Sequence, residues 1–166
     1  MLRTERLQIL PLTLEQFTLL LTDNGCLQRS LGLRPSGTSL DEYTHEAMSG
    51  LRQEAESHPE NSFWYTYWMI IHTADSVSIG GLCFMGEPDA SGIVEIGYGI
   101  DAPFRNHGYM TEALSAVCIW AKEQTDVHAV TAVCEKDNTA SARVLEKCGF
   151  CVCGTVGELI HWQTSG

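Results

Sequence analysis

The segment from Arg105 to Thr111 combines residue types that suit the binding of an anion. It follows an apolar run, Ile93 to Ile100, and opens a stretch with helical periodicity. The first turn of a helix has N–H groups without intrahelical acceptors and lies at the positive end of the helix dipole. Gly108 would let a bulky anion approach these groups closely. We therefore predict a phosphate-binding loop whose members are Arg105, Asn106, His107, Gly108, Tyr109, Met110 and Thr111.

Glu95 and Ser141 are two polar residues that could face a ligand bound at this loop. A carboxylate on a strand beside a bound ligand can take a proton directly or through water, and burial would raise its pKa usefully. The alternative for Glu95 is an exposed or capping glutamate. Ser141 begins an apolar helix face with Val144 and Leu145, so its hydroxyl faces a ligand or bonds to the backbone of its own helical turn. The residues alone leave both alternatives open.

The elements that position these residues are predicted to form one mixed α/β domain covering residues 1–166. Apolar periodicity and turn residues predict strands at 6–10, 63–72, 77–85, 93–100 and 128–134. They predict helices at 13–22, 39–57, from Gly108 onward and around 138–148, with Asn24-Gly25 ending the first of these. The strands between 63 and 100 should form an antiparallel meander. The strands at 93–100 and 128–134, with the helix between them, should form a β-α-β unit that starts at the phosphate site.

Two of the predicted helices carry finer detail. The helix that follows Gly108 should bury one stripe of side chains, formed by Met110, Ala113, Leu114, Val117, Cys118 and Ala121. Asp137 or Asn138 should cap the last helix, and Gly149 followed by Phe150 should end it in a left-handed cap with an apolar contact.

The composition excludes several classes of function. With 10 Lys and Arg against 21 Asp and Glu, the net charge is −11, so nucleic acid is a poor partner and a cationic partner is favoured. A phosphate would then be held by local dipoles and not by a basic field. No apolar run follows the charges of the N-terminus, and the apolar stretches are too short to span a bilayer. We expect a cytoplasmic protein that binds no membrane.

The seven cysteines are predicted to be reduced thiols without a metal. Their odd number and the expected cytoplasmic location argue against disulfides. Cys148 and Cys151 have CxxC spacing, but Cys148 ends a helix, where the dipole does not stabilise a thiolate. A structural zinc site needs four ligands, and no second CxxC or paired histidine supplies them.

Four motifs of this chain resemble those of the GNAT superfamily of acetyl-CoA-dependent N-acetyltransferases, and they follow one another along the chain in the order typical of that superfamily. The loop Arg105-x-x-Gly108-x-Met110 is similar to the pyrophosphate loop Gln/Arg-x-x-Gly-x-Gly/Ala, with Met110 in place of the small residue. The other three resemble the branch that acetylates the N-terminal residues of ribosomal proteins: Thr4-Glu5-Arg6-Leu7, Glu95-Ile96-Gly97-Tyr98 and Asn138-x-x-Ser141. The resemblance implies a GNAT-like fold, with a largely antiparallel sheet of about six to seven strands flanked by about four helices.

The resemblance also implies an activity, the transfer of an acetyl group from the cosubstrate acetyl-CoA to a primary amine. The amine attacks directly in a ternary complex, and no acyl-enzyme forms. In this comparison the loop from Arg105 to Thr111 holds the pyrophosphate, and Asn138 contacts the pantetheine arm or orders its loop. Backbone amides near Tyr98, Gly99 and Ile100 would polarise the acetyl carbonyl.

The catalytic roles implied by the resemblance fall on Glu95 and Ser141. Many GNAT enzymes have a tyrosine on the last helix that protonates the departing thiolate, and this chain has Leu145 there. Ser141 is then the candidate donor, through a hydrogen bond to the thiolate, because a serine hydroxyl is a poor acid. Glu95 is the candidate base that takes the proton of the amine.

Other readings stay open at this point. Gly97-x-Gly99-x-x-Ala102 matches a dinucleotide-binding pattern, but Pro103 separates it from the helix and no acidic residue follows at the ribose-binding distance. A stronger alternative is a non-catalytic acetyl-CoA sensor. The acceptor is a peptide N-terminus or a small-molecule amine, and residues 24–60 with Trp64, Tyr67 and Trp68 would shape its side of the cleft unless these aromatics are core. The protein is expected to be a monomer or homodimer.

Overall fold

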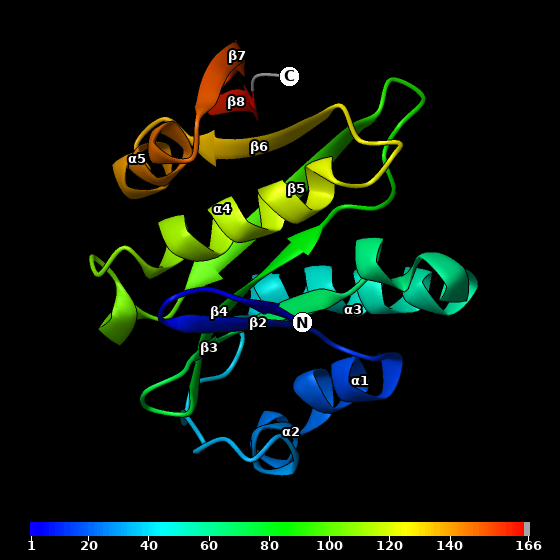
Figure 1. Cartoon of the computed structure of the whole chain (residues 1–166), viewed down its shortest axis with the longest axis vertical. Coiled ribbons are helices and arrows are strands. Elements are labelled where there is room, and N and C mark those ends of the chain that lie inside the picture. The colour runs from blue at the N-terminus through cyan, green and yellow to red at the C-terminus, as the bar shows by residue number, and fades with distance from the viewer. Residues whose placement is uncertain (165–166) are drawn as a thin grey trace.

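A sheet of eight strands runs through residues 1–164, the part of the chain that this computed structural model describes. The strands are β1 (Leu2–Arg3), β2 (Leu7–Pro11), β3 (Tyr67–His72), β4 (Val77–Phe84), β5 (Ile93–Ile100), β6 (Ala129–Glu135), β7 (Phe150–Val156) and β8 (Leu159–Thr164). The α-helices are α1 (Leu14–Thr22), α2 (Asn24–Ser30), α3 (Glu42–Ser57), α4 (Tyr109–Lys122) and α5 (Thr139–Lys147). Short 3₁₀ helices are η1 (Pro59–Trp64) and η2 (Ala102–Phe104). The strand order is β1-β2-β3-β4-β5-β6-β8-β7, and α4 crosses one face of the sheet (Figure 1).

Two apolar cores form because the middle of the sheet is covered on both faces. All eight residues of β4 are buried, as expected of a strand with helices on both sides. Leu82 and Phe84 pack with the buried stripe of α4 on one face. Cys83 packs on the other face with Phe17 and Leu27 of the N-terminal helices. The two faces of β5 therefore look toward different helices, which matters for the site below.

Several predictions from the sequence are confirmed. β5 has the predicted bounds, and β3, β4 and β5 form an antiparallel meander. β6 runs parallel to β5, so the predicted β-α-β unit is present with α4 as its crossover helix. The predicted stripe of α4 is buried at all six positions, Met110, Ala113, Leu114, Val117, Cys118 and Ala121. Asn138 caps α5, and Gly149 follows that helix with a left-handed φ of 80° while Phe150 is buried.

The element count differs from the prediction. The sheet has eight strands within residues 1–164, more than the predicted six to seven, because β1 and the C-terminal hairpin extend it at both edges. The first helix ends at Thr22 as predicted, but Asn24 and Gly25 begin α2 and do not form a turn, since the Asp23 side chain accepts from the N–H of Cys26 at 2.8 Å. η1 occupies the stretch up to Trp64, so β3 begins later than predicted. Within residues 1–164, no helix is both long and apolar enough to cross a membrane.

β5 and β6 separate after a short parallel pairing, and this separation creates the site. Their paired residues are Ile93 to Glu95 on β5 and Ala129 to Thr131 on β6. Beyond them β6 pairs with β8, while β5 continues along β4 as far as Ile100. The second half of β5 is thus an inner strand with one side open, a wedge between two strands of the same sheet.

Candidate active site

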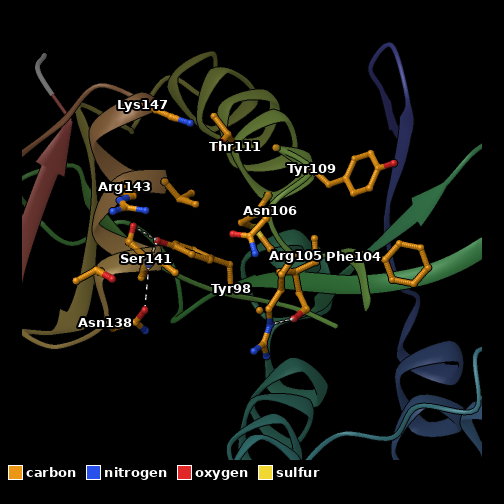
Figure 2. Close-up of a pocket in the computed structure, with 17 residues that line it drawn as sticks. Tyr98, Phe104, Arg105, Asn106, Tyr109, Thr111, Asn138, Ser141, Arg143 and Lys147 are labelled. Atoms are coloured by element: carbon orange, nitrogen blue, oxygen red, sulfur yellow. Dashed lines mark hydrogen bonds between the residues drawn. The ribbon is translucent and has the colours of Figure 1, made fainter. Parts of the chain in front are cut away.

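A cavity of about 720 Å³ opens in the wedge between β5 and β6, a volume typical of a small-molecule or cofactor site. β5, the loop before α4, the first turn of α4 and one face of α5 along its length all contribute to its wall (Figure 2). The lining includes eleven residues that the sequence singled out: Tyr98, Gly99, Ile100, Arg105, Asn106, Gly108, Tyr109, Met110, Thr111, Asn138 and Ser141. His107 and Glu95 are not part of it.

The peptide groups of Tyr98 and Ile100 face the open side of β5. The N–H of Met85 donates to the carbonyl of Glu95, and the N–H of Asp101 donates to the carbonyl of Ile79. In an antiparallel pair, residues that bond to the partner alternate with residues whose peptide groups point away from it. Tyr98 and Ile100 therefore direct their N–H and carbonyl groups into the wedge. The carbonyl of Ile100 already accepts from Arg105 Nε at 3.2 Å. An extended amide-bearing ligand can bond to the peptide groups of Tyr98 and to the N–H of Ile100 as a strand would.

The loop before α4 presents a cluster of backbone N–H groups to the other end of the cavity. Asn106 and Gly108 have φ values of 64° and 79°, and successive residues in such turns make concave sites for anions. The first α4 bond runs from the N–H of Glu112 to the carbonyl of Gly108, 3.1 Å long. The N–H groups of Tyr109, Met110 and Thr111 thus precede the intrahelical ladder and remain for a ligand.

Met110 does not obstruct this loop. Its side chain is only 5% exposed and packs in the core beneath α4. The Met110 side chain, which replaces the small residue of the similar loops, therefore lies away from the cavity. Only the Met110 backbone reaches the anion-binding turn.

A clamp of Thr4, Arg6 and Glu112 holds the loop from behind. Glu112 Oε1 accepts from the hydroxyl of Thr4 at 2.6 Å and from the N–H of Arg6 at 2.9 Å, and its Oε2 accepts from Arg6 Nε at 2.7 Å. Arg6 Nη1 also donates to the carbonyl of His107, and the guanidinium lies over the ring of Tyr109, 4.5 Å from its centre. The opening Thr-Glu-Arg motif thus has a structural reason, since it ties the N-terminus to the loop.

The electrostatics of the clamp fix Glu112 in its charged form. Burial alone would raise the pKa of this carboxyl, but the hydrogen bonds from Thr4 and Arg6 and the charge of Arg6 hold the pKa below its usual 4.5. A lowered pKa means that the stabilisation is present above the unfolded value and is lost as the pH falls through the folded value. The clamp is therefore intact at neutral pH.

Glu112→Gln should lower the affinity for the ligand of this loop by about tenfold. The amide NH₂ of glutamine cannot accept a hydrogen bond, so it faces the donors of Arg6 or leaves one donor of Thr4 or Arg6 without an acceptor, and the loop is held less firmly. The variant should also lose less stability than the wild type on acidification below pH 4.5. Calorimetric titration and thermal melts at several pH values measure both effects. Glu123→Gln, at the far end of α4, is the matched control, and equal affinities in the two variants would show that the clamp does not position the loop.

Three basic side chains line the cavity although the chain is acidic: Arg105, Arg143 and Lys147. Arg143 and Lys147 are one helical turn apart on α5, so both lie along the same wall (Figure 2). The prediction that dipoles alone hold a phosphate was therefore incomplete. The four-residue spacing on a predicted helix was a signal for this pair. Phe104, Thr139, Ala140 and Val144 are further lining residues that the sequence analysis did not select.

Ser141 and Tyr98 form a hydrogen-bonded pair inside the cavity. Their hydroxyl oxygens are 2.7 Å apart, and the side chains point toward each other from α5 and β5 (Figure 2). The N–H of Ser141 donates to Asn138 Oδ1 at 3.0 Å, so the capping role belongs to Asn138 and the Ser141 hydroxyl stays in the cavity. Burial raises the pKa of Tyr98 to about 12, against the opposing effect of Ser141. Leu145 is fully buried in the core.

Glu95 lies apart from this pair. Its side chain is exposed, so the burial on which its sequence interpretation relied is not found. It shares with Gly97 and Gly99 the face of β5 opposite to Tyr98. Trp64 and Trp68 were expected to shape the acceptor side of the cleft unless they were core. They are core, because they belong to an aromatic cluster with Phe84 and Trp120.

Comparison with known proteins identifies this arrangement. The chain matches the acetyltransferase (GNAT) domain family over residues 6–151. It belongs to this family. Members of this family are acetyltransferases, and the acetyl donor of the family is acetyl-CoA. Its fold is the mixed α/β GNAT fold, with a sheet that is mainly antiparallel.

Sequence relatives and solved structures agree with the family. The chain is 37% identical over 95 residues to the uncharacterized N-acetyltransferase YjdG of Bacillus subtilis, which is 57% of this chain and 56% of that protein. This match thus spans about half of the relative's length. A ribosomal-protein-S5-alanine acetyltransferase from Vibrio fischeri has a TM-score of 0.70 at 16% identity, covering 99% of this chain and 95% of that one. RimL, a ribosomal L7/L12 α-N-protein acetyltransferase in complex with coenzyme A, has a TM-score of 0.69 at 18% identity, covering 98% and 95%. These low identities establish the fold alone.

Proposed function

We propose that this GNAT domain, formed by residues 1–166, transfers the acetyl group of acetyl-CoA to a primary amine in the wedge between β5 and β6. The observation that carries the proposal is the pairing of two backbone features in one cavity. The peptide groups of Tyr98 and Ile100 suit the amides of the pantetheine arm, and the N–H groups that begin α4 suit its pyrophosphate.

The chemistry of the cavity wall fits coenzyme A in other respects. Arg105, Arg143 and Lys147 supply positive charge for its phosphates, and Asn138 orders the first turn of α5 beside the arm. The bound molecule supplies an activated thioester. The N–H groups on the open side of β5 then polarise the acetyl carbonyl, which makes its carbon more reactive toward an amine.

Tyr98 and Ser141 provide a path for the proton that the departing thiolate needs. When the Tyr98 hydroxyl donates to Ser141 Oγ, the Ser141 hydrogen is free to point at the sulfur. A chain of two hydrogen bonds polarises its members, so the serine becomes a better donor than it is alone. The raised pKa of Tyr98, about 12, keeps this phenol protonated at neutral pH.

Glu95 is proposed as the base that takes the proton of the amine, through water, from the opposite face of β5. Glu95→Gln should lower kcat/KM for the amine by about ten- to a hundredfold, with little change in acetyl-CoA affinity. The loss should be greatest near neutral pH, where the amine is still protonated. An unchanged pH–rate profile would show that Glu95 has no role in proton transfer.

We propose a peptide N-terminus as the first acceptor to test, because two of the solved neighbours are named for acetylating ribosomal proteins. The test is release of CoA thiol from acetyl-CoA with a panel of amines. It should include short peptides, their α-N-acetylated forms, a polyamine and free amino acids. Amine-dependent thiol release supports the proposal. Tight acetyl-CoA binding without release to any amine would favour the non-catalytic sensor.

A further inference from the structure

An open space lies over Gly99 on the face of β5 that is turned away from the Tyr98–Ser141 pair. Side chains alternate along a strand, and Tyr98 points toward α5, so a side chain at residue 99 would point to the side of α1 and α3. A Cβ built on Gly99 meets no atom within 4 Å. At Gly97, on the same face, the Cε of Met85 already lies 2.7 Å from such a Cβ. The opening is therefore confined to the point where β5 borders the cavity.

Tyr67 and Asp101 stand at the edge of this space. Gly81 is the cross-strand neighbour of Gly99, and the ring of Tyr67 lies directly over Gly81. Burial raises the pKa of the Tyr67 hydroxyl, and the charge of Asp101 raises it further. Asp101 is also the second residue after Gly99 along the chain.

Only one of the two carboxylate oxygens of Asp101 accepts a side-chain hydrogen bond within residues 1–164. Thr38 Oγ1 donates to Asp101 Oδ2 at 3.0 Å, and Oδ1 accepts no hydrogen bond from residues 1–164. Thr38 is held in turn by Asn24, whose Nδ2 donates to its carbonyl at 3.2 Å. Within the same described range, Asn24 Oδ1 is buried and has no hydrogen-bond partner. A carboxylate oxygen without a donor favours a cation that carries several N–H groups.

We propose that Asp101 binds the protonated acceptor amine in the space over Gly99, between the ring of Tyr67 and the backbone of β5. This inference rests on the proposed function, and it names the residue that selects a cationic primary amine. The ammonium reaches the acetyl carbonyl across the edge of β5, from the face opposite to α4. Tyr67 and Gly99 limit the width of the entrance, and Asp101 supplies its charge.

Charge-selective labelling tests the proposal without knowledge of the natural acceptor. In Gly99→Cys, a thiol projects into the open space. Two methanethiosulfonate reagents, the cationic 2-aminoethyl and the anionic 2-sulfonatoethyl compound, both modify thiols and differ mainly in charge. Peptide mapping separates modification at residue 99 from modification of the exposed Cys151 and Cys153. We expect the cationic reagent to react faster than the anionic one. Adding Asp101→Asn should reduce the rate ratio by about fivefold, as expected for one charge within about 7 Å at a partly exposed site.

Glu95→Gln in the Gly99→Cys background is the matched control. It removes the same charge from the same face of β5, but four residues away, so the ratio should change by less than about twofold because of screening. An unchanged ratio in Asp101→Asn, or an equal fall in both variants, would overturn the inference. Calorimetric titration of acetyl-CoA tests the proposed function separately, because its outcome does not depend on the labelling rates.

A kinetic measurement on the protein that retains Gly99 is a second, independent test. With the best amine of the panel, Asp101→Asn should raise the KM for the amine by about tenfold and leave the KM for acetyl-CoA unchanged. Equal KM values for the amine in the variant and the wild type would contradict the role of Asp101.

Discussion

Gly108→Val is expected to weaken acetyl-CoA binding by about a hundredfold or more, equivalent to about 2.7 kcal/mol, while the domain stays folded. Gly108 has a φ of 79°, and a β-branched residue resists this conformation. The nearest atom to an added Cβ is Arg6 Nη2 at 3.6 Å, an ordinary contact, so the effect arises in the backbone and not from a clash. Relaxation of this strain would turn the N–H groups of the first α4 turn away from the pyrophosphate.

Gly149→Val is the matched control for this experiment. Gly149 has nearly the same φ, 80°, with no atom within 4 Å of an added Cβ, and it lies outside the cavity lining. Both variants should lose a similar amount of thermal stability, and only Gly108→Val should lose affinity in a calorimetric titration. Wild-type affinity in a folded Gly108→Val protein would mean that the pyrophosphate is held elsewhere.

Ser141→Ala is expected to lower kcat by about ten- to a hundredfold, with the KM for acetyl-CoA nearly unchanged. The hydroxyl contributes mainly when negative charge develops on the sulfur, and Asn138 keeps its capping bond to the Ser141 backbone. Tyr98→Phe should lower kcat by about tenfold, because it removes the donor to Ser141 Oγ. The double variant should be no slower than Ser141→Ala, since both groups act through one chain of hydrogen bonds.

Two measurements keep this prediction falsifiable. Thr139→Ala removes another hydroxyl from the cavity wall of α5 and should leave kcat close to the wild-type value. Because burial raises the pKa of Tyr98 to about 12, ionisation of Tyr98 should not lower kcat at any pH value under about 11. Additive losses in the double variant would show that Tyr98 and Ser141 act separately, and a wild-type kcat in Ser141→Ala would assign protonation of the thiolate to water.

Local sequence patterns predicted the elements that surround the site. The apolar period of α4 located its buried stripe, and the bounds of β5 followed from an apolar run that ends before Pro103. The C-terminal hairpin was harder to predict, because β7 is exposed along most of its length and so lacks an alternating pattern. α2 was missed because the turn signal of Asn24-Gly25 outweighed the cap that Asp23 supplies.

Contacts between distant segments account for most of what the sequence did not predict at the site. Arg6 and Glu112 are 106 residues apart, and Tyr98 and Ser141 are 43 apart, so no periodicity connects them. Tyr98 was selected for its backbone, and only the crossing of β5 and α5 shows that its hydroxyl meets Ser141. The exposure of Glu95 is likewise set by which helices cover each face of β5.

Titration of acetyl-CoA into isotope-labelled protein, followed by amide chemical shifts, tests the central claim most directly. The account predicts saturable shifts concentrated in three segments, residues 98–100, 105–111 and 138–143, which surround the cavity. The amides of Tyr109, Met110 and Thr111 should move most, because they face the pyrophosphate. Saturable binding with the largest shifts outside these segments, or no shifts at millimolar acetyl-CoA, would contradict the assignment of the wedge between β5 and β6 as the acetyl-CoA site.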